Sequence, residues 1–343
     1  MKKGRSHIKK QRLFYLDFVR AVALVSILVI HFNATVTGYF TLPHKLFASV
    51  LPFGIYLGDF GSSLFFIVSG AALALTVPED QSPLTFYKKR AKAIYPLFWL
   101  AWVVCFSIRF VTKPGYYAAA KTPTLLLTVL GLDNFAVAAG WVGTDFACVG
   151  EWFLGSILFL YLLFPLLHRG LRRKPWLTWI VAVLVCLPIH LTGWDARLVA
   201  IHVLEFMFGM QYLRLQKNAK VGLAVLFAVG TVACANLDSK ITCAFFSMAV
   251  FTALAGISRW LDRPWPRVIC GRLAKLSYAI FLVHHVLIQR MAENFDLAAL
   301  TRRDTAFLFL IYLAAVWAAA EALLWLQRCL QKGYAALRPS AGM

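Results

Sequence analysis

Three ionisable side chains, Asp17, Arg20 and His31, lie within the first long apolar run of the chain, at residues 13–32. Ionisable groups are costly to bury in a membrane-length helix, so their presence predicts a function. Because an α-helix turns by about 100° per residue, all three side chains fall on one face of that helix. The rise of about 1.5 Å per residue sets His31 roughly 16 Å further along the axis than Arg20.

This layout places a cation near one membrane surface and an imidazole near the other, on the face that also carries Leu24 and Ile27. An imidazole is the side chain best suited to take a proton from a weak nucleophile at neutral pH. The arrangement therefore suits chemistry conducted across a bilayer. The structural alternative is that Asp17 and Arg20 pair as an interfacial anchor and that His31 only ends the helix.

Composition places the chain in the class of polytopic membrane proteins. It is 61% hydrophobic and 15% charged over 343 residues, with a mean hydropathy of +0.71, which is too apolar for a soluble domain. The net charge of +20 comes from short basic clusters between apolar runs. Such clusters are typical of cytoplasmic loops, so we expect the lipid bilayer as a partner and no nucleic acid.

Ten apolar runs are long enough to span a membrane. They lie at about residues 13–32, 53–77, 94–111, 151–167, 176–191, 198–213, 221–236, 241–258, 273–291 and 306–327. We therefore predict an all-α, multi-pass protein of the cytoplasmic (inner) membrane. It forms a single domain over residues 1–343, with about ten transmembrane helices.

A shorter run at about 124–139 decides the topology, because Gly131, Asp133 and Asn134 interrupt it. If it does not cross and the N-terminus is inside, the cytoplasmic segments carry 25 Lys and Arg residues and the outer segments 9. If it crosses, this positive-inside bias is lost. We therefore expect that it does not cross.

Both termini are then cytoplasmic, with a basic N-terminus at residues 1–12 and a tail at residues 329–343. Residues 112–150 form an outer-face excursion, part of it re-entrant. The N-terminal apolar stretch is not expected to be a cleavable signal, because it is long enough to span and carries Asp17 and Arg20. The seven cysteines show no paired or metal-ligand spacing, so we expect no metal. The sequence contains no P-loop and no Gly-rich dinucleotide loop, and we expect no permanently bound cofactor.

Five stretches follow one another in the order of a known family. They are residues 15–20 with His31 eleven positions after Arg20, residues 61–70, residues 86–90 leading into 94–99, residues 152–154 with 161–165, and residues 277–284. Together they resemble the acyltransferase-3 family of membrane acyltransferases, in its compact branch without an appended extracytoplasmic domain. Each stretch alone is a weak signal, but five in family order on a ten-span chain are specific.

The resemblance implies an enzyme that takes an acyl group, usually acetyl, from cytoplasmic acyl-CoA and delivers it to a hydroxyl of a carbohydrate on the far side of the membrane. It implies His31 as the catalytic base, with Asp17 and Arg20 lining the donor's path. The phosphates of CoA would pair with four cations expected in one short cytoplasmic loop, Lys88, Lys89, Arg90 and Lys92.

The chain departs from the family pattern at three places. Ala93 stands where a second Arg is common, so a bidentate phosphate contact is lost. Ile157 and Leu158 occupy positions that are acidic in many members, and Glu151 precedes Trp152 where some relatives have His. The resemblance therefore defines the acceptor side less well than the donor side.

Further side chains are candidates for the acceptor site or the cavity, namely Ser69, Glu151, Trp152, Tyr161, His202, Glu205 and His284. Structural alternatives exist for several of them. His202 and Glu205 are three residues apart and could pair with each other on one helix face. His284 is next to His285, and the two imidazoles could mark the outer membrane interface.

The predicted excursion carries acidic and aromatic residues, and each of them also has both a functional and a structural explanation. Asp133, Asp145 and Glu151 could bind the hydroxyls of a sugar or be solvated loop carboxylates. Trp141 and Trp152 could stack on a sugar or belong to the interfacial aromatic belt.

Two other function classes fit parts of the pattern. A secondary transporter or flippase would use intramembrane Asp, Arg and His residues as a proton or substrate relay. However, the sequence shows no corresponding pair of interrupted helices in two halves. A non-catalytic scaffold would leave the shared face of Asp17, Arg20 and His31 unexplained.

Overall fold

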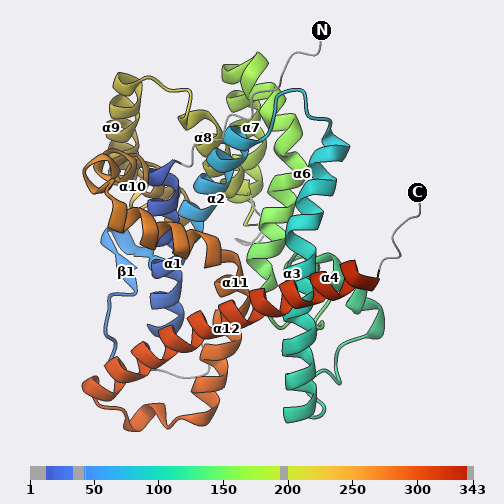
Figure 1. Ribbon diagram of the computed structural model, residues 1–343. Helices are drawn as coiled ribbons and strands as arrows, with labels where there is room; N and C mark the ends of the chain where they lie inside the picture. Colours follow the sequence, from blue (N-terminus) through green and yellow to red (C-terminus); the bar gives the residue numbers. More distant parts are fainter. Residues whose placement is uncertain (1–12, 34–41, 43, 194–199, 338–343) are drawn as a thin grey trace.

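The computed structural model describes residues 13–33, 42, 44–193 and 200–337, apart from the side chains of residues 134, 151 and 335–337. The predicted basic N-terminus at residues 1–12 and the last residues of the predicted tail, 338–343, lie outside this part of the chain. Within it, the chain is predominantly helical (Figure 1).

Ten helices form at the ten predicted apolar runs. They are α1 (Phe14–Asn33), α2 (Leu57–Thr76), α3 (Pro83–Thr112), α6 (Glu151–Arg173), α7 (Pro175–Leu191), α8 (Ala200–Tyr212), α9 (Lys217–Cys234), α10 (Ser239–Leu261), α11 (Pro264–Asn294) and α12 (Arg302–Leu337). Among the described residues, eight helices are long and apolar enough to cross a membrane. Helix α7 has 17 residues and α8 has 13, so crossing by all ten stays a prediction.

Several helices extend beyond the predicted runs. Helix α3 begins at Pro83, where the missing N–H of proline costs nothing, and the Ser82 hydroxyl accepts a hydrogen bond from the Thr85 amide at 3.3 Å. The prediction of a basic loop at residues 88–92 is therefore wrong, because these residues form early turns of α3. Helix α12 likewise continues to Leu337, through most of the predicted tail.

A small hairpin before α2 departs from the all-α prediction. Strands β1 (Val50–Leu51) and β2 (Ile55–Tyr56) pair antiparallel around the 3₁₀ turn η1 (Pro52–Gly54). Phe53 and Gly54 both have positive φ angles, 66° and 71°, which ends any continuous helix at this point. Helix α2 therefore starts at Leu57 and not at the beginning of the predicted run.

Helices α2 and α8 make the closest approach through two glycines. A Cβ atom on Gly70 would lie 2.1 Å from the carbonyl oxygen of Phe206, and one on Gly209 would lie 1.9 Å from that of Ile67. Small residues let two helix backbones approach closely within a membrane, where packing drives association. This contact fixes α2 against α8 and therefore fixes the α2 face that carries Ser69.

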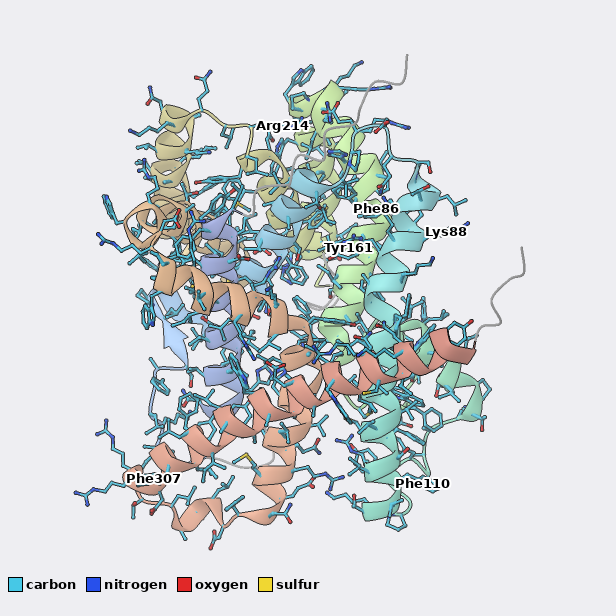
Figure 2. All side chains as sticks on the ribbon, viewed as in Figure 1. Phe86, Lys88, Phe110, Tyr161, Arg214 and Phe307 are labelled. Atoms are coloured by element: carbon cyan, nitrogen blue, oxygen red, sulfur yellow. The ribbon has the colours of Figure 1, made fainter. Side chains whose placement is uncertain are left out.

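Ion pairs show which helix ends lie together. Arg172, at the end of α6, pairs with Glu79 between α2 and α3. Lys113, just after α3, contacts Glu293 near the end of α11 at 2.6 Å. Figure 2 shows the same division, with Phe86, Lys88 and Arg214 toward one end and Phe110 and Phe307 at the other.

The segment between α3 and α6 doubles back on itself. It contains the 3₁₀ turn η2 (Thr122–Thr124) and the short helices α4 (Leu125–Leu130) and α5 (Asp133–Ala138). The carbonyls of Val129 and Leu130 accept hydrogen bonds from Trp99 and Tyr95, at 2.8 and 3.0 Å, near the middle of α3. The segment therefore turns back against α3 without a continuous helix, and its re-entrant character and its place on the outer side both stay predictions.

We predict that Gly209→Ala destabilises the protein by about 1–3 kcal/mol or more, because the new methyl group meets a backbone carbonyl that has no room to move. The matched control is Gly222→Ala on α9, where nothing lies within 4 Å of the added Cβ. Thermal unfolding of the purified proteins in detergent gives the measurement. Equal melting temperatures for Gly209→Ala and the wild type would refute the close α2–α8 contact.

We predict that a cysteine at position 118 reacts with an impermeant maleimide in intact cells and that one at position 173 reacts only after permeabilisation. The background needs only Cys234 and Cys329 replaced, because the other native cysteines are buried. Labelling of Arg173→Cys from outside would reverse the proposed topology.

Candidate active site

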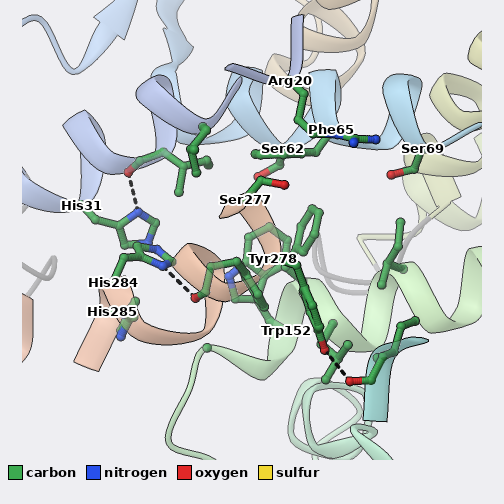
Figure 3. Close-up of a pocket in the computed structure, with 18 of the residues that line it drawn as sticks. Arg20, His31, Ser62, Phe65, Ser69, Trp152, Ser277, Tyr278, His284 and His285 are labelled. Atoms are coloured by element: carbon green, nitrogen blue, oxygen red, sulfur yellow. Dashed lines mark hydrogen bonds between the residues drawn. The ribbon is translucent and has the colours of Figure 1, made fainter. Parts of the chain in front are cut away.

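A cavity of about 270 Å³ lies among α1, α2, α3, α6 and α11 (Figure 3). Helix α1 contributes Arg20, Leu24, Ile27 and His31 to its wall, which confirms that these residues share one face. Asp17 is not part of the lining. It is 7% exposed and lies within electrostatic range of Cys270 on α11.

Two imidazoles meet at one end of the cavity. The Nδ1 atom of His31 is 2.8 Å from the carbonyl oxygen of Ile27, and Nδ1 of His284 is 2.7 Å from that of Phe281. Because a carbonyl only accepts hydrogen bonds, each Nδ1 carries the hydrogen and each neutral ring keeps a bare Nε2. The two ring centroids are 4.8 Å apart, and Nε2 of His284 has no hydrogen-bond partner among the described residues.

A third imidazole, His285, completes this end of the cavity. Its ring centroid lies 5.3 Å from that of His31, and it is within electrostatic range of Arg109. Both His284 and His285 line the cavity, which is the position that a functional role requires. The sequence signal that could have identified His285 is its place directly after the fifth family stretch.

Cationic and hydroxyl groups gather toward the other end of the cavity. Tyr161 on α6 and Ser69 on α2 both line the cavity, and Tyr161 lies within electrostatic range of Arg20 and Arg90. Figure 3 shows Arg20 and Ser69 away from the three imidazoles, with Phe65 and Tyr278 along the wall. The structure thus brings together the predicted residues Arg20, Ser69 and Tyr161.

Arg90 differs from the three lysines predicted to act with it. Its guanidinium carbon lies 5.9 Å from the Phe86 ring centroid, and its buried Nε has no hydrogen-bond partner among the described residues. Lys88, Lys89 and Lys92 are exposed, because successive helix positions are rotated by about 100°. Arg90 does not line the cavity, but it is the one of the four that is partly buried, and it lies within electrostatic range of the wall residue Tyr161.

The two tryptophans of the predicted excursion occupy different places relative to the cavity. Trp152 lines the cavity, where it could meet a substrate. Trp141 is 78% exposed and lies outside the cavity. Glu151 begins α6, but its side chain lies outside the described residues.

His202 and Glu205 belong to a separate polar cluster. They pair with each other at 2.8 Å, as the structural alternative proposed, and their neighbours include Lys240, which contacts Asp59 at 2.6 Å. The Phe66 ring, with its centroid 4.3 Å from that of His202, lies between this cluster and the cavity residue Phe153. The structure therefore does not bring His202 and Glu205 to His31.

Sequence reasoning missed several wall residues, among them Ser62, Phe65, Ser277, Tyr278 and Phe281. The Tyr278 hydroxyl donates a hydrogen bond to the carbonyl of Ile94 at 3.1 Å, which ties α11 to α3 beside the cavity. In the described part of the chain, no group of three or more His, Cys, Asp or Glu side chains, the three imidazoles included, is arranged so that it could hold a metal ion. The arrangement can attract an anion at one end and take up a proton at the other.

Comparison with known proteins agrees with this chemistry. A family model described as an acyltransferase domain matches residues 13–324, which include every residue of the cavity wall. The chain is also 28% identical over 272 residues to Acyltransferase MdmB of Streptomyces mycarofaciens. That alignment covers 68% of this chain and 69% of the relative.

Proposed function

This chain belongs to the acyltransferase-3 family, and from that premise we propose that it transfers an acyl group, acetyl in the first instance, from cytoplasmic acyl-CoA across the membrane to a hydroxyl of an extracytoplasmic glycan or lipid-linked saccharide. The observation that carries the proposal is one cavity holding Arg20 at one end and the bare Nε2 atoms of His31 and His284 at the other.

The donor is proposed to approach from the end of Arg90 and Arg20. CoA carries several phosphates, and a guanidinium group binds a phosphate oxygen pair through two parallel N–H donors. Between the arginines and the imidazoles, the wall is formed by apolar side chains such as Leu24, Ile27 and Phe65. An extended pantetheine arm fits such a passage, because it is uncharged and carries the thioester at its far end.

The acyl transfer itself requires a base. In the proposed step, Nε2 of His31 takes the proton of the acceptor hydroxyl while the hydroxyl oxygen attacks the thioester carbonyl carbon. The carbon–sulfur bond breaks, and the CoA thiolate receives a proton from the imidazolium. The products are the acyl ester and free CoA, and His31 is neutral again.

His284 is proposed to assist this proton transfer. Its ring is buried, stands nearly perpendicular to that of His31 at 88°, and also presents a bare Nε2. A proton taken up by one imidazole therefore has a second neutral imidazole beside it. A transport relay would also use such groups, but an acyltransferase family supports acyl transfer as the function.

We predict that His31→Gln lowers acyl transfer by roughly a hundred to ten-thousand-fold, because general-base help is worth about that much. His284→Gln should lower the rate less, since it removes the assisting group and keeps the base. The assay follows label from acetyl-CoA to saccharide, normalised to purified and correctly inserted protein. His44→Gln, at an exposed position, is the matched control.

Wild-type turnover by His31→Gln would rule out the base role. A loss of protein with normal turnover per molecule would instead assign His31 a structural role at the helix end.

We predict that Arg90→Ala raises the KM for acyl-CoA by roughly ten- to a hundredfold, as expected for the loss of a hydrogen bond to a charged group. The KM for the acceptor should not change. Lys88→Ala is the control, because Lys88 is exposed on a different side of the same helix. Equal donor dependence for the two variants would remove Arg90 from the donor site.

A further inference from the structure

A second cavity, of about 450 Å³, adjoins the first at its imidazole end. The two cavities share Gly150, Trp152 and His285 in their walls. The second cavity lies between the turn after α3 and the turn before α6, on the side away from Arg90. The proposed function assigns no role to it.

The walls of the second cavity are tied to the helices around them. The Tyr117 ring packs against both Phe106 and Phe146, with centroid distances of 4.9 and 5.6 Å. The Thr144 hydroxyl donates a hydrogen bond to the carbonyl of Ala119 at 2.8 Å, which joins the two turns. The cavity is therefore preformed, as small-molecule sites commonly are.

Two of its side chains present groups that a ligand could use. Tyr116 is 48% exposed, and its hydroxyl accepts a hydrogen bond from Arg109 at 3.3 Å, which holds the ring in place. The Arg109 guanidinium carbon lies over one face of this ring, 4.6 Å from its centroid, so a ligand would stack on the opposite face. Asp145 uses Oδ1 to accept the Ala147 amide at 3.0 Å. Its Oδ2 accepts no hydrogen bond from any residue that the structure describes and remains open to a hydroxyl donor.

The charges of the wall discriminate between ligand classes. The lining includes Asp133 and Asp145 and contains no Lys or Arg among the described residues, while the Arg109 guanidinium lies beside the wall residue Tyr116, 4.6 Å from its ring centroid. Two carboxylates in the wall outnumber this one cation and repel phosphates and other anions, so CoA is disfavoured here. A lipid tail would gain nothing from a carboxylate, whereas a neutral polyol would use it as a hydrogen-bond acceptor.

We propose that this second cavity is the acceptor site and that its occupant is a neutral pyranose, stacked on Tyr116 and hydrogen-bonded to Asp145. A pyranose ring has an apolar C–H face and a rim of hydroxyls, which match an aromatic ring beside a carboxylate. Trp152 and His285 form the shared wall, so a hydroxyl presented there faces His31. This proposal rests on the proposed function.

The test is photo-crosslinking of the purified full-length protein with a methyl glucopyranoside that carries a diazirine, followed by mapping of the modified residues. We expect crosslinks at residues 116–117 and 144–152. Tyr116→Ala and Asp145→Asn should each lower the yield by roughly three- to tenfold. Tyr116→Phe keeps the ring and should retain most of the yield.

The control is Trp141→Ala, which lies in the same segment, is 78% exposed and lines neither cavity. Asp145→Asn keeps both the volume and the Oδ1 acceptor, so it preserves the fold if Tyr116→Ala does not. Crosslinks that map elsewhere, no crosslinks, or equal yields for Asp145→Asn and the wild type would overturn the proposal.

Acyl transfer is measured separately on the same preparations. Transfer that continues while the sugar crosslinks elsewhere refutes this inference and leaves the proposed function intact. Crosslinking at the second cavity without any transfer refutes the proposed function and leaves the sugar site in place.

Discussion

The burial of polar groups at membrane depth is the constraint on which this structure depends. An imidazole in an apolar environment must satisfy its N–H, since an unmet hydrogen bond costs about 1–3 kcal/mol. His31 and His284 meet this requirement within their own helices, by donating from Nδ1 to the carbonyls of Ile27 and Phe281. Each ring is thereby oriented, and its Nε2 is left for chemistry. Structural and catalytic demands are met by different nitrogens of one side chain.

The two adjoining cavities form one continuous path past these imidazoles. Arg90 and Arg20 lie toward one end, the imidazoles occupy the middle, and Trp152 and His285 lead to a second cavity that contains Asp145. Two guanidinium groups mark the first end, and two carboxylates line the second cavity, with the single guanidinium of Arg109 beside Tyr116. An anionic donor is attracted to one end and repelled from the other, whereas a neutral polyol is accepted at the carboxylate end. In this account, electrostatics separates the two substrates before they meet at His31.

The sequence predicts much of this site because helical periodicity determines which side chains share a face. The α1 wall and the absence of a continuous helix at residues 124–139 both follow from spacing and from the distribution of basic residues. The same reasoning fails for residues 88–92, because a charge cluster suggests a loop although Ser82 and Pro83 start a helix there. It names Asp145 as one of two alternatives but does not bring it together with His285 and Tyr116, since contacts between α3, α6 and α11 depend on tertiary packing that local patterns do not contain.

The central claim is that donor and acceptor react from opposite sides of the membrane. Inside-out vesicles from expressing cells test it directly, because they expose the cytoplasmic face and enclose the cell's own surface saccharides. Radiolabelled acetyl-CoA is added to sealed vesicles, and the label on enclosed saccharide is measured. The account predicts labelling in sealed vesicles that depends on His31 and does not increase on permeabilisation. Labelling that occurs only after permeabilisation would show that both substrates bind from the same side, and would contradict the account.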